Sequence, residues 1–182
     1  MRPRQLTFFK TPSFTELSRR AHGGNLREGK RKLTRPFDPK KPLHLVLRST
    51  RARREWSLLR AKNVKRTKNL VYREAARAGV KIYQYANAGN HLHLVVRAKR
   101  RADLARFLRT TTGLIARVIT GAKKGQPKNA ALGGRFWDRL AYSRIVEWGR
   151  EFKRVCEYLV TNELEGLGWW EFGRAAKRDA FS

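Results

Sequence analysis

The sequence is poor in several features on which other protein classes depend. Only one cysteine, Cys156, occurs among the 182 residues, which excludes an internal disulfide framework and indicates a reducing compartment. No run of residues is long and apolar enough to cross a bilayer, and no apolar signal-peptide core follows the basic N-terminus. We therefore expect a cytoplasmic protein that does not span a membrane.

Acidic residues are also scarce. The chain has 14 Asp and Glu against 43 Lys and Arg, which gives a formal net charge of +29 at pH 7. A charge of this size repels itself and favours a polyanionic partner. Nucleic acid is the first candidate, ahead of an anionic membrane surface, and we expect no membrane partner. The charge alone fits a nucleic-acid enzyme and a binding protein without chemistry equally well.

Apolar periodicity divides the chain into an extension and one domain. Residues 1–41 show little periodicity and form a basic extension, which we expect to be flexible until it meets phosphate. The domain is expected over residues 42–168, followed by a tail over 169–182. Within the domain, the pattern predicts strands over 43–48, 80–85, 90–96 and near the end of 135–146, helices over 53–78, 103–120 and 150–164, and a basic loop over 122–134.

The order of these elements indicates the fold class. It runs strand, helix, strand, strand, helix, strand, helix, and the turn residues at 87–90 predict a hairpin between the second and third strands. This order is typical of an α+β domain of the ferredoxin-like split βαβ type. Such a domain has an antiparallel sheet with helices on one face, here with a C-terminal helix that carries a tyrosine.

Two histidines alternate within the third predicted strand. Because successive strand side chains point to opposite faces, His91 and His93 share one face, while Leu92, Leu94 and Val96 point into a core. Two imidazoles side by side on a rigid element are half of a metal site. The alternative interpretation is two structural histidines that happen to alternate.

Two oxygen-bearing side chains share a face of the last predicted helix. Tyr158 and Asn162 are four residues apart, which places them one above the other. The tyrosine offers a nucleophilic phenol, and the asparagine a carbonyl oxygen that suits a hard cation. Tyr158 is alternatively a core aromatic, and Tyr142 is the second candidate nucleophile. Tyr83 and Tyr85 are expected to share one face of the neighbouring strand.

Three stretches together resemble a known family. Residues 90–96 (Asn-His-Leu-His-Leu-Val-Val) resemble the HUH motif, two histidines around a hydrophobic residue. Residues 158–162 (Tyr-Leu-Val-Thr-Asn) resemble the tyrosine-helix motif of single-tyrosine HUH transposases. Residues 136–146 resemble the segment before that helix in REP-associated tyrosine transposases. The resemblance covers roughly residues 42–168.

The resemblance implies a specific activity. Members of this family cleave and rejoin single-stranded DNA through a 5′-phosphotyrosine intermediate, as transposases or domesticated derivatives. By resemblance, Tyr158 is the nucleophile, and His91, His93 and Asn162 hold Mg²⁺ or Mn²⁺. The resemblance also implies a single-stranded DNA partner with hairpin structure, a nucleoid-associated location, and a homodimer in which the tyrosine helix can come from the partner.

Basic residues flank the predicted site in sequence and are candidates for phosphate contacts. Those after the histidine strand rank first because they follow it directly, and Trp137 is a candidate for stacking on a base or, alternatively, for burial. A basic DNA- or RNA-binding protein without catalysis remains the alternative function, and a third option keeps DNA binding without transposition. The DNA-binding candidates are Arg51, Arg53, Arg54, Lys99, Arg100, Arg101, Lys123, Lys124 and Trp137.

Overall fold

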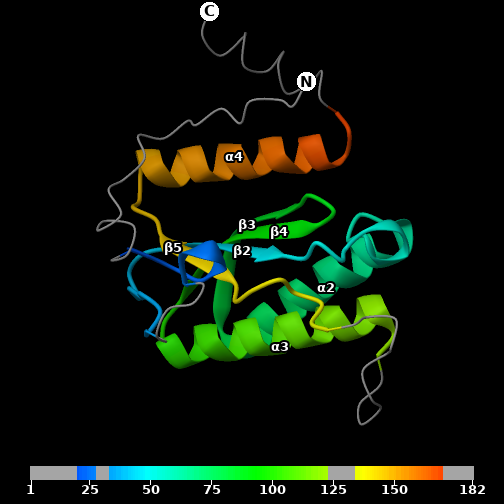
Figure 1. Ribbon diagram of the computed structural model, residues 1–182. Coiled ribbons are helices and arrows are strands. Elements are labelled where there is room, and N and C mark those ends of the chain that lie inside the picture. The colour runs from blue at the N-terminus through cyan, green and yellow to red at the C-terminus, as the bar shows by residue number, and fades with distance from the viewer. Residues whose placement is uncertain (1–19, 28–32, 123–133, 170–182) are drawn as a thin grey trace, which may run out of the picture.

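A five-stranded antiparallel sheet forms the centre of the computed structural model, which describes residues 20–27, 33–122 and 134–169 (Figure 1). The strand order is β1-β5-β2-β4-β3, and every neighbouring pair is antiparallel. This architecture confirms the predicted α+β class. The strands are β1 (Ala21–His22), β2 (Leu43–Arg48), β3 (Val80–Asn87), β4 (His91–Ala98) and β5 (Tyr142–Ile145).

Helices cover both faces of the sheet. α2 (Ala61–Ala78) and α3 (Arg101–Thr120) lie together on one face, and α4 (Arg150–Gly166) lies across the other (Figure 1). Two short 3-10 helices, η1 (Gly24–Arg27) and η2 (Arg54–Trp56), complete the described elements. Within the described residues, no helix has the length and apolar content of a membrane span.

α2 begins later than the sequence pattern predicts. The helix was expected from residue 53, but residues 54–56 form η2 and the α-helix starts at Ala61. Asn63 explains the difference, because its side-chain amide donates to the carbonyls of Glu55 at 3.1 Å and Ser57 at 2.8 Å. These two carbonyls therefore have a hydrogen-bond partner without any helical bond. The segment before Ala61 can thus form a loop instead of the first turns of the helix.

Strand alternation builds the main core between the sheet and the pair α2 and α3. Leucines of β2 and β4 point to this side, and residues of α3 meet them there. Fully buried side chains of this core include Leu43, Leu45, Leu92, Leu94, Val96, Leu104, Phe107 and Ile115.

The opposite side of the sheet holds a smaller apolar cluster. Val155 and Leu159 of α4 pack against Ala86, Val95 and Val146. Through this cluster α4 packs on β3 and β4. It lies on the face of the sheet that also carries the two histidines of β4.

The β3–β4 hairpin forms as predicted, with one irregularity. Asn87 donates to Leu58 O at 2.9 Å and accepts from Gly89 N at 3.0 Å, and Gly89 has a φ of +85°. The pairing shifts register between Ile82 and Gln84. The expectation that Tyr83 and Tyr85 share a face is therefore wrong, because this bulge turns them into different clusters.

Part of the expected N-terminal extension belongs to the sheet. β1 pairs with β5, with Ala21 opposite Arg144, and Arg35 donates to Ala141 O at 2.9 Å. A two-residue strand has no periodicity to detect, so only its pairing reveals it. The rest of this extension, residues 1–19 and 28–32, and the tail from residue 170 lie outside the described residues.

Candidate active site

His91 and His93 lie side by side on the face of the sheet that α4 covers. Their ring centroids are 4.7 Å apart at an interplanar angle of 73°. His93 is buried, whereas His91, the first residue of β4, is half-buried. The alternation of the strand therefore places the pair on one face, as predicted.

Each imidazole is held by a neighbour through its Nδ1 atom. His91 Nδ1 lies 2.5 Å from Asn90 Oδ1, and because that oxygen can only accept, the imidazole donates. His93 Nδ1 lies 3.1 Å from Nε2 of His44. Nε2 of His93 is buried and has no protein partner. A histidine that is bonded through one nitrogen and has no protein partner at the other is typical of a metal ligand.

His44 also belongs to this cluster, although it lies outside the three sequence motifs. Its ring lies nearly parallel to that of His93, at an interplanar angle of 15° and a centroid distance of 5.3 Å. The available signal was its position in β2, where alternation points it away from the leucine face. The contact itself depends on β2 lying beside β4, with Val46 opposite His93.

The histidine cluster is uncharged at neutral pH. Burial lowers the pKa of His93 to about 2, with His44 and His91 adding to the effect. Burial and the nearby Arg144 lower the pKa of His44 to about 3. Burial and Arg48 also lower the pKa of His91. Neutral imidazoles keep the lone pair that a metal ligand needs.

Tyr158 faces the histidines from α4 of the same chain. Its ring centroid is 5.8 Å from that of His93 and 6.4 Å from that of His44, nearly perpendicular to both. The side chain is 44% exposed, because Val155 and Leu159 take the buried positions of the helix. Tyr158 is therefore not a core aromatic, and its phenol is open to a ligand.

Asn162 lies one turn further along α4 but does not reach the histidines. Its side-chain amide donates to the Tyr158 carbonyl at 2.8 Å, within its own helix. Among the described residues, no group of three or more His, Cys, Asp or Glu side chains is arranged to hold a metal ion. The bond engages the amide nitrogen and not the Oδ1 atom, so Asn162 as the third ligand stays a prediction.

Tyr142, the second candidate nucleophile, borders the cluster on β5. Its ring centroid lies 6.5 Å from that of His44, and burial raises the pKa of its phenol. It is half-buried, and Tyr158 is the more exposed of the two phenols. The geometry thus favours Tyr158.

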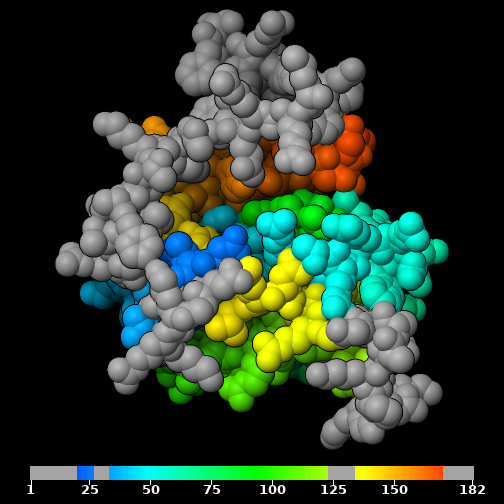
Figure 2. All heavy atoms as spheres, in the orientation of Figure 1, coloured from blue at the N-terminus to red at the C-terminus, as the bar shows by residue number. Residues whose placement is uncertain are grey.

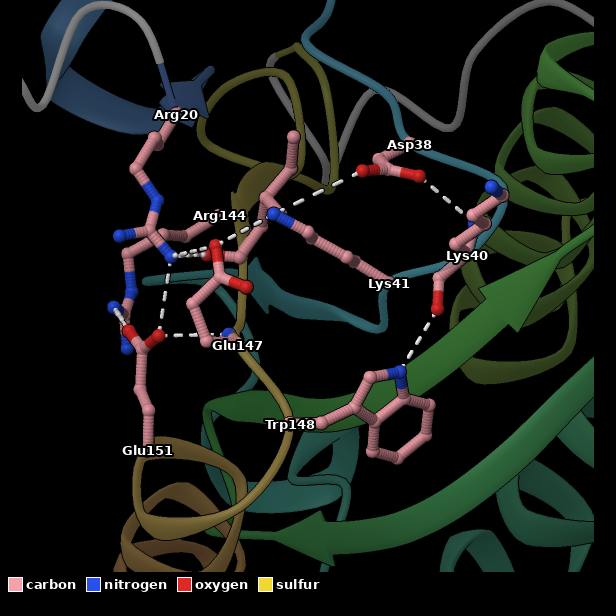
Figure 3. A network of polar contacts seen from close by, with 9 residues as sticks. Arg20, Asp38, Lys40, Lys41, Arg144, Glu147, Trp148 and Glu151 are labelled. Atoms are coloured by element: carbon pink, nitrogen blue, oxygen red, sulfur yellow. Dashed lines mark hydrogen bonds and ion pairs between the residues drawn. The ribbon is translucent and has the colours of Figure 1, made fainter.

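A polar network fixes the start of α4 beside the sheet (Figure 3). Glu151 accepts from the backbone N–H of Glu147 at 2.7 Å and from Arg20 at 3.1 Å, and it also pairs with Arg144. Lys41 donates to Glu147 at 2.8 Å. The network joins α4 to β5 and to residues of the predicted extension, and so it orients the helix that carries Tyr158.

Basic residues lie at the end of β2 and in the segment that follows it. Arg48, the last residue of β2, pairs with His91 across the sheet, and its side chain is 66% exposed. Arg51 is half-buried, and Arg53 and Arg54 are exposed. In the space-filling view, this segment lies beside residues 134–145 and below α4 (Figure 2). Arg48 was missed because its proximity depends on strand pairing.

The residues ranked first for DNA contact lie far from the histidines. Lys99, Arg100 and Arg101 follow the opposite end of β4, and six residues of strand from His93 to Lys99 span about 20 Å. Arg100 forms two hydrogen bonds with Asp103, at 2.9 and 3.0 Å. Arg101 donates to the Arg35 carbonyl. Their rank is therefore corrected, because adjacency in sequence along an extended strand is separation in space.

Two further DNA-binding predictions have different outcomes. Trp137 is half-buried, and its indole N–H donates to the Thr112 carbonyl of α3 at 2.9 Å. Its ring also contacts Phe136, so packing accounts for it and a stacking role has no support. Lys123 and Lys124 lie outside the described residues.

The fold and the site together define a class: an antiparallel α+β domain with a histidine pair on a central strand and a tyrosine on a covering helix. The sequence matches the family model described as "Transposase IS200 like" over residues 40–162. The chain therefore belongs to the IS200-like transposase family. No curated protein matches it.

Two solved structures resemble the chain at low identity. A candidate transposase from Deinococcus radiodurans R1 has 16% identity and a TM-score of 0.45, over 73% of this chain and 98% of that one. A REP-associated tyrosine transposase bound to a REP hairpin has 9% identity and a TM-score of 0.49, over 74% of this chain and 73% of that one.

Proposed function

We propose that this transposase-family protein cleaves and rejoins single-stranded DNA through a covalent bond to Tyr158. One observation carries the proposal. The exposed phenol of Tyr158 stands 5.8 Å, between ring centroids, from His93, whose buried Nε2 has no protein partner. An exposed phenol and an imidazole whose Nε2 has no protein partner are thus neighbours within one chain.

The residues present suit a divalent ion, Mg²⁺ or Mn²⁺. His91 and His93 offer neutral imidazoles oriented through their Nδ1 atoms, and imidazole together with oxygen ligands is a workable set for Mn²⁺. Asn162 would add its carbonyl oxygen, which the bond from its amide nitrogen to the Tyr158 carbonyl does not engage. When bound, the ion supplies positive charge that orients the scissile phosphate and neutralises its developing charge.

The proposed reaction is a balanced exchange of phosphate esters. The Tyr158 oxygen attacks phosphorus and loses its proton, while the bond from phosphorus to the 3′ oxygen breaks and that oxygen leaves as a hydroxyl after gaining a proton. The product is a 5′-phosphotyrosine and a free 3′-hydroxyl. Because one phosphodiester replaces another, rejoining is the same exchange in reverse and needs no nucleotide triphosphate.

Basic side chains beside His91 suit an anionic substrate. Arg48 ends β2 opposite His91, and Arg53 and Arg54 are exposed in the segment that follows β2. Their guanidinium groups would neutralise phosphates on either side of the scissile bond, and binding would therefore weaken as salt rises.

Adduct formation tests the proposal. The protein is incubated with Mn²⁺ or Mg²⁺ and single-stranded DNA that carries a hairpin and a label at its 3′ end, and labelled protein is resolved on a denaturing gel. We expect an adduct with the wild type and with Tyr142→Phe, and none with Tyr158→Phe. An adduct that persists in Tyr158→Phe would overturn the nucleophile assignment.

A binding protein without chemistry is the second candidate function. One observation favours it: among the described residues, no three or more His, Cys, Asp or Glu side chains are grouped to hold a metal ion. This function predicts tight, salt-sensitive binding of DNA or RNA with no adduct in any divalent metal.

A further inference from the structure

His44 is buried, with 8% of its surface exposed, and it belongs to none of the sequence motifs of the site. Its Nε2 lies 3.1 Å from His93 Nδ1, and the two rings are nearly parallel, as an in-plane hydrogen bond between them requires. A buried polar side chain needs a partner, and here the partner is a candidate metal ligand rather than the backbone.

We propose that His44 is a positioning residue that accepts the Nδ1 hydrogen of His93, and so holds His93 with its Nε2 lone pair facing Tyr158 and the bound phosphate. The role rests on the proposed function for its purpose, but it concerns a hydrogen bond that can be observed without metal or DNA.

The geometry separates this role from that of a third metal ligand. His44 Nε2 is hydrogen-bonded to Nδ1 of His93, whereas Nε2 of His93 has no protein partner. An ion bound to His93 Nε2 would therefore lie across the ring from His44. The arrangement corresponds to the outer partner that metal-bound histidines usually have, with an imidazole in place of a carboxylate or carbonyl.

The sheet and its neighbours hold His44 in place. Its strand is paired on both sides, with His44 opposite Val95 of β4 and Arg144 of β5. The rings of Tyr142 and Tyr158 meet it edge-on at 6.5 and 6.4 Å. Because the backbone is paired and two aromatic rings contact the imidazole, His44 has little freedom to turn away from His93.

Loss of this partner should weaken metal binding without removing a ligand. Outer partners of metal-bound histidines are worth about 10–100-fold in metal affinity. We expect His44→Phe, which keeps the ring volume but cannot accept, to raise the Kd for Mn²⁺ by that factor. His44→Gln, whose amide oxygen can accept, should recover part of the loss.

The test reads the tautomer of His93 in the metal-free protein by long-range proton–nitrogen NMR, and the affinity for Mn²⁺ by the electron spin resonance of free ion. We expect His93 to carry its hydrogen on Nδ1 in the wild type and in His44→Gln, and to lose this preference in His44→Phe. Melting curves confirm that each variant is folded. If His44→Phe alone does not fold, the tautomer in the wild type and in His44→Gln decides.

Several outcomes would overturn the positioning role. One is Nε2–H on His93 in the wild type, and another is an unchanged tautomer in folded His44→Phe. A third is complete loss of Mn²⁺ binding in His44→Gln despite an unchanged tautomer, which would make His44 a ligand. If the wild type shows the expected tautomer and His44→Phe loses it, but no variant binds Mn²⁺, the positioning role stands and the metal-dependent function fails.

Discussion

The two faces of the sheet are built from the same strands yet differ in chemistry. On one face, leucines of β2 and β4 meet α2 and α3 in a continuous apolar core. On the other, the same strands present His44, His91 and His93, and α4 rests on a smaller cluster around Val95. The comparison shows how a period of two lets one strand stabilise the fold with alternate residues and build a site with the rest.

The helices on the two faces also differ in charge. α2 has one acidic residue, the buried Glu74, against six basic ones, whereas α4 has four acidic and three basic residues. A shallow groove of about 300 Å³ lined by Arg66 and Arg73 lies on the α2 side. α2 is therefore more positively charged than α4, the helix that carries Tyr158. We expect attraction for phosphate and chemistry on phosphate to be separable by mutation.

The largest effect should come from the site face. Tyr158→Phe removes the proposed nucleophile and should reduce adduct formation below detection. Because Tyr158 is 44% exposed, the free energy of unfolding should change by less than about 0.5 kcal/mol. Denaturant unfolding and the adduct assay measure the two effects on one preparation. A large loss of stability would mean that Tyr158 supports the fold instead.

Next in size is a change on the core face. Leu94 is fully buried beside His93 in sequence but on the opposite side of the sheet. Leu94→Ala should lower the free energy of unfolding by about 2–5 kcal/mol through lost burial and a residual cavity. Below its melting temperature, the variant should still form adducts. Selective loss of adducts in a stable Leu94→Ala protein would contradict the division between the faces.

A smaller effect is expected from charge on α2. Neutralising the exposed Lys62 and Arg66 to Gln should weaken single-strand binding and lower the slope of log Kd against log salt by about 1.4, if both contact phosphate. At saturating DNA, adduct formation should be unchanged. The matched variant on α4 neutralises Lys153 and Arg154, where nearby glutamates already offset the charge. An equal or larger loss of DNA binding in the α4 variant would contradict the expectation that α2 attracts phosphate more strongly than α4.

The smallest effect concerns the anchor of α4. Burial opposes ionisation of Glu151, but the Glu147 N–H, Arg144 and Arg20 outweigh it, so the pKa of Glu151 is lowered from 4.5. A depressed folded-state pKa adds stability above the unfolded value, which is lost as pH falls through the folded one. The wild type should therefore lose more stability than Glu151→Gln below about pH 4.5. The carboxyl is partly exposed, so we expect less than about 1 kcal/mol, measured by denaturant unfolding against pH.

Much of the fold is predictable from pattern. The leucine alternation of β2, the Asn- and Gly-rich turn before His91 and the apolar spacing of α3 are local signals, and the structure confirms each element. The late start of α2 at Ala61 and the bulge at Tyr83 were not predicted. A side-chain hydrogen bond to a loop and a shift in strand register do not change the spacing of apolar residues in the sequence.

The candidate site was predictable in part. His91, His93 and Tyr158 come together in the structure, whereas Asn162 bonds to its own helix. Lys99 to Arg101 follow the motif in sequence but lie at the other end of the strand. An extended strand separates neighbours by about 3.3 Å per residue, so nearness in sequence is a poor guide to nearness in a sheet.

The sequence by itself determined which residues alternate: two histidines on one side of a strand, leucines on the other, and a tyrosine on an amphipathic helix. These are short-range properties of backbone geometry. Only the tertiary structure decided that β2 lies beside β4, which brings His44 to His93 and Arg48 to His91, and that α4 closes on its own sheet. Strand order and helix docking depend on contacts between distant segments, which no local pattern encodes.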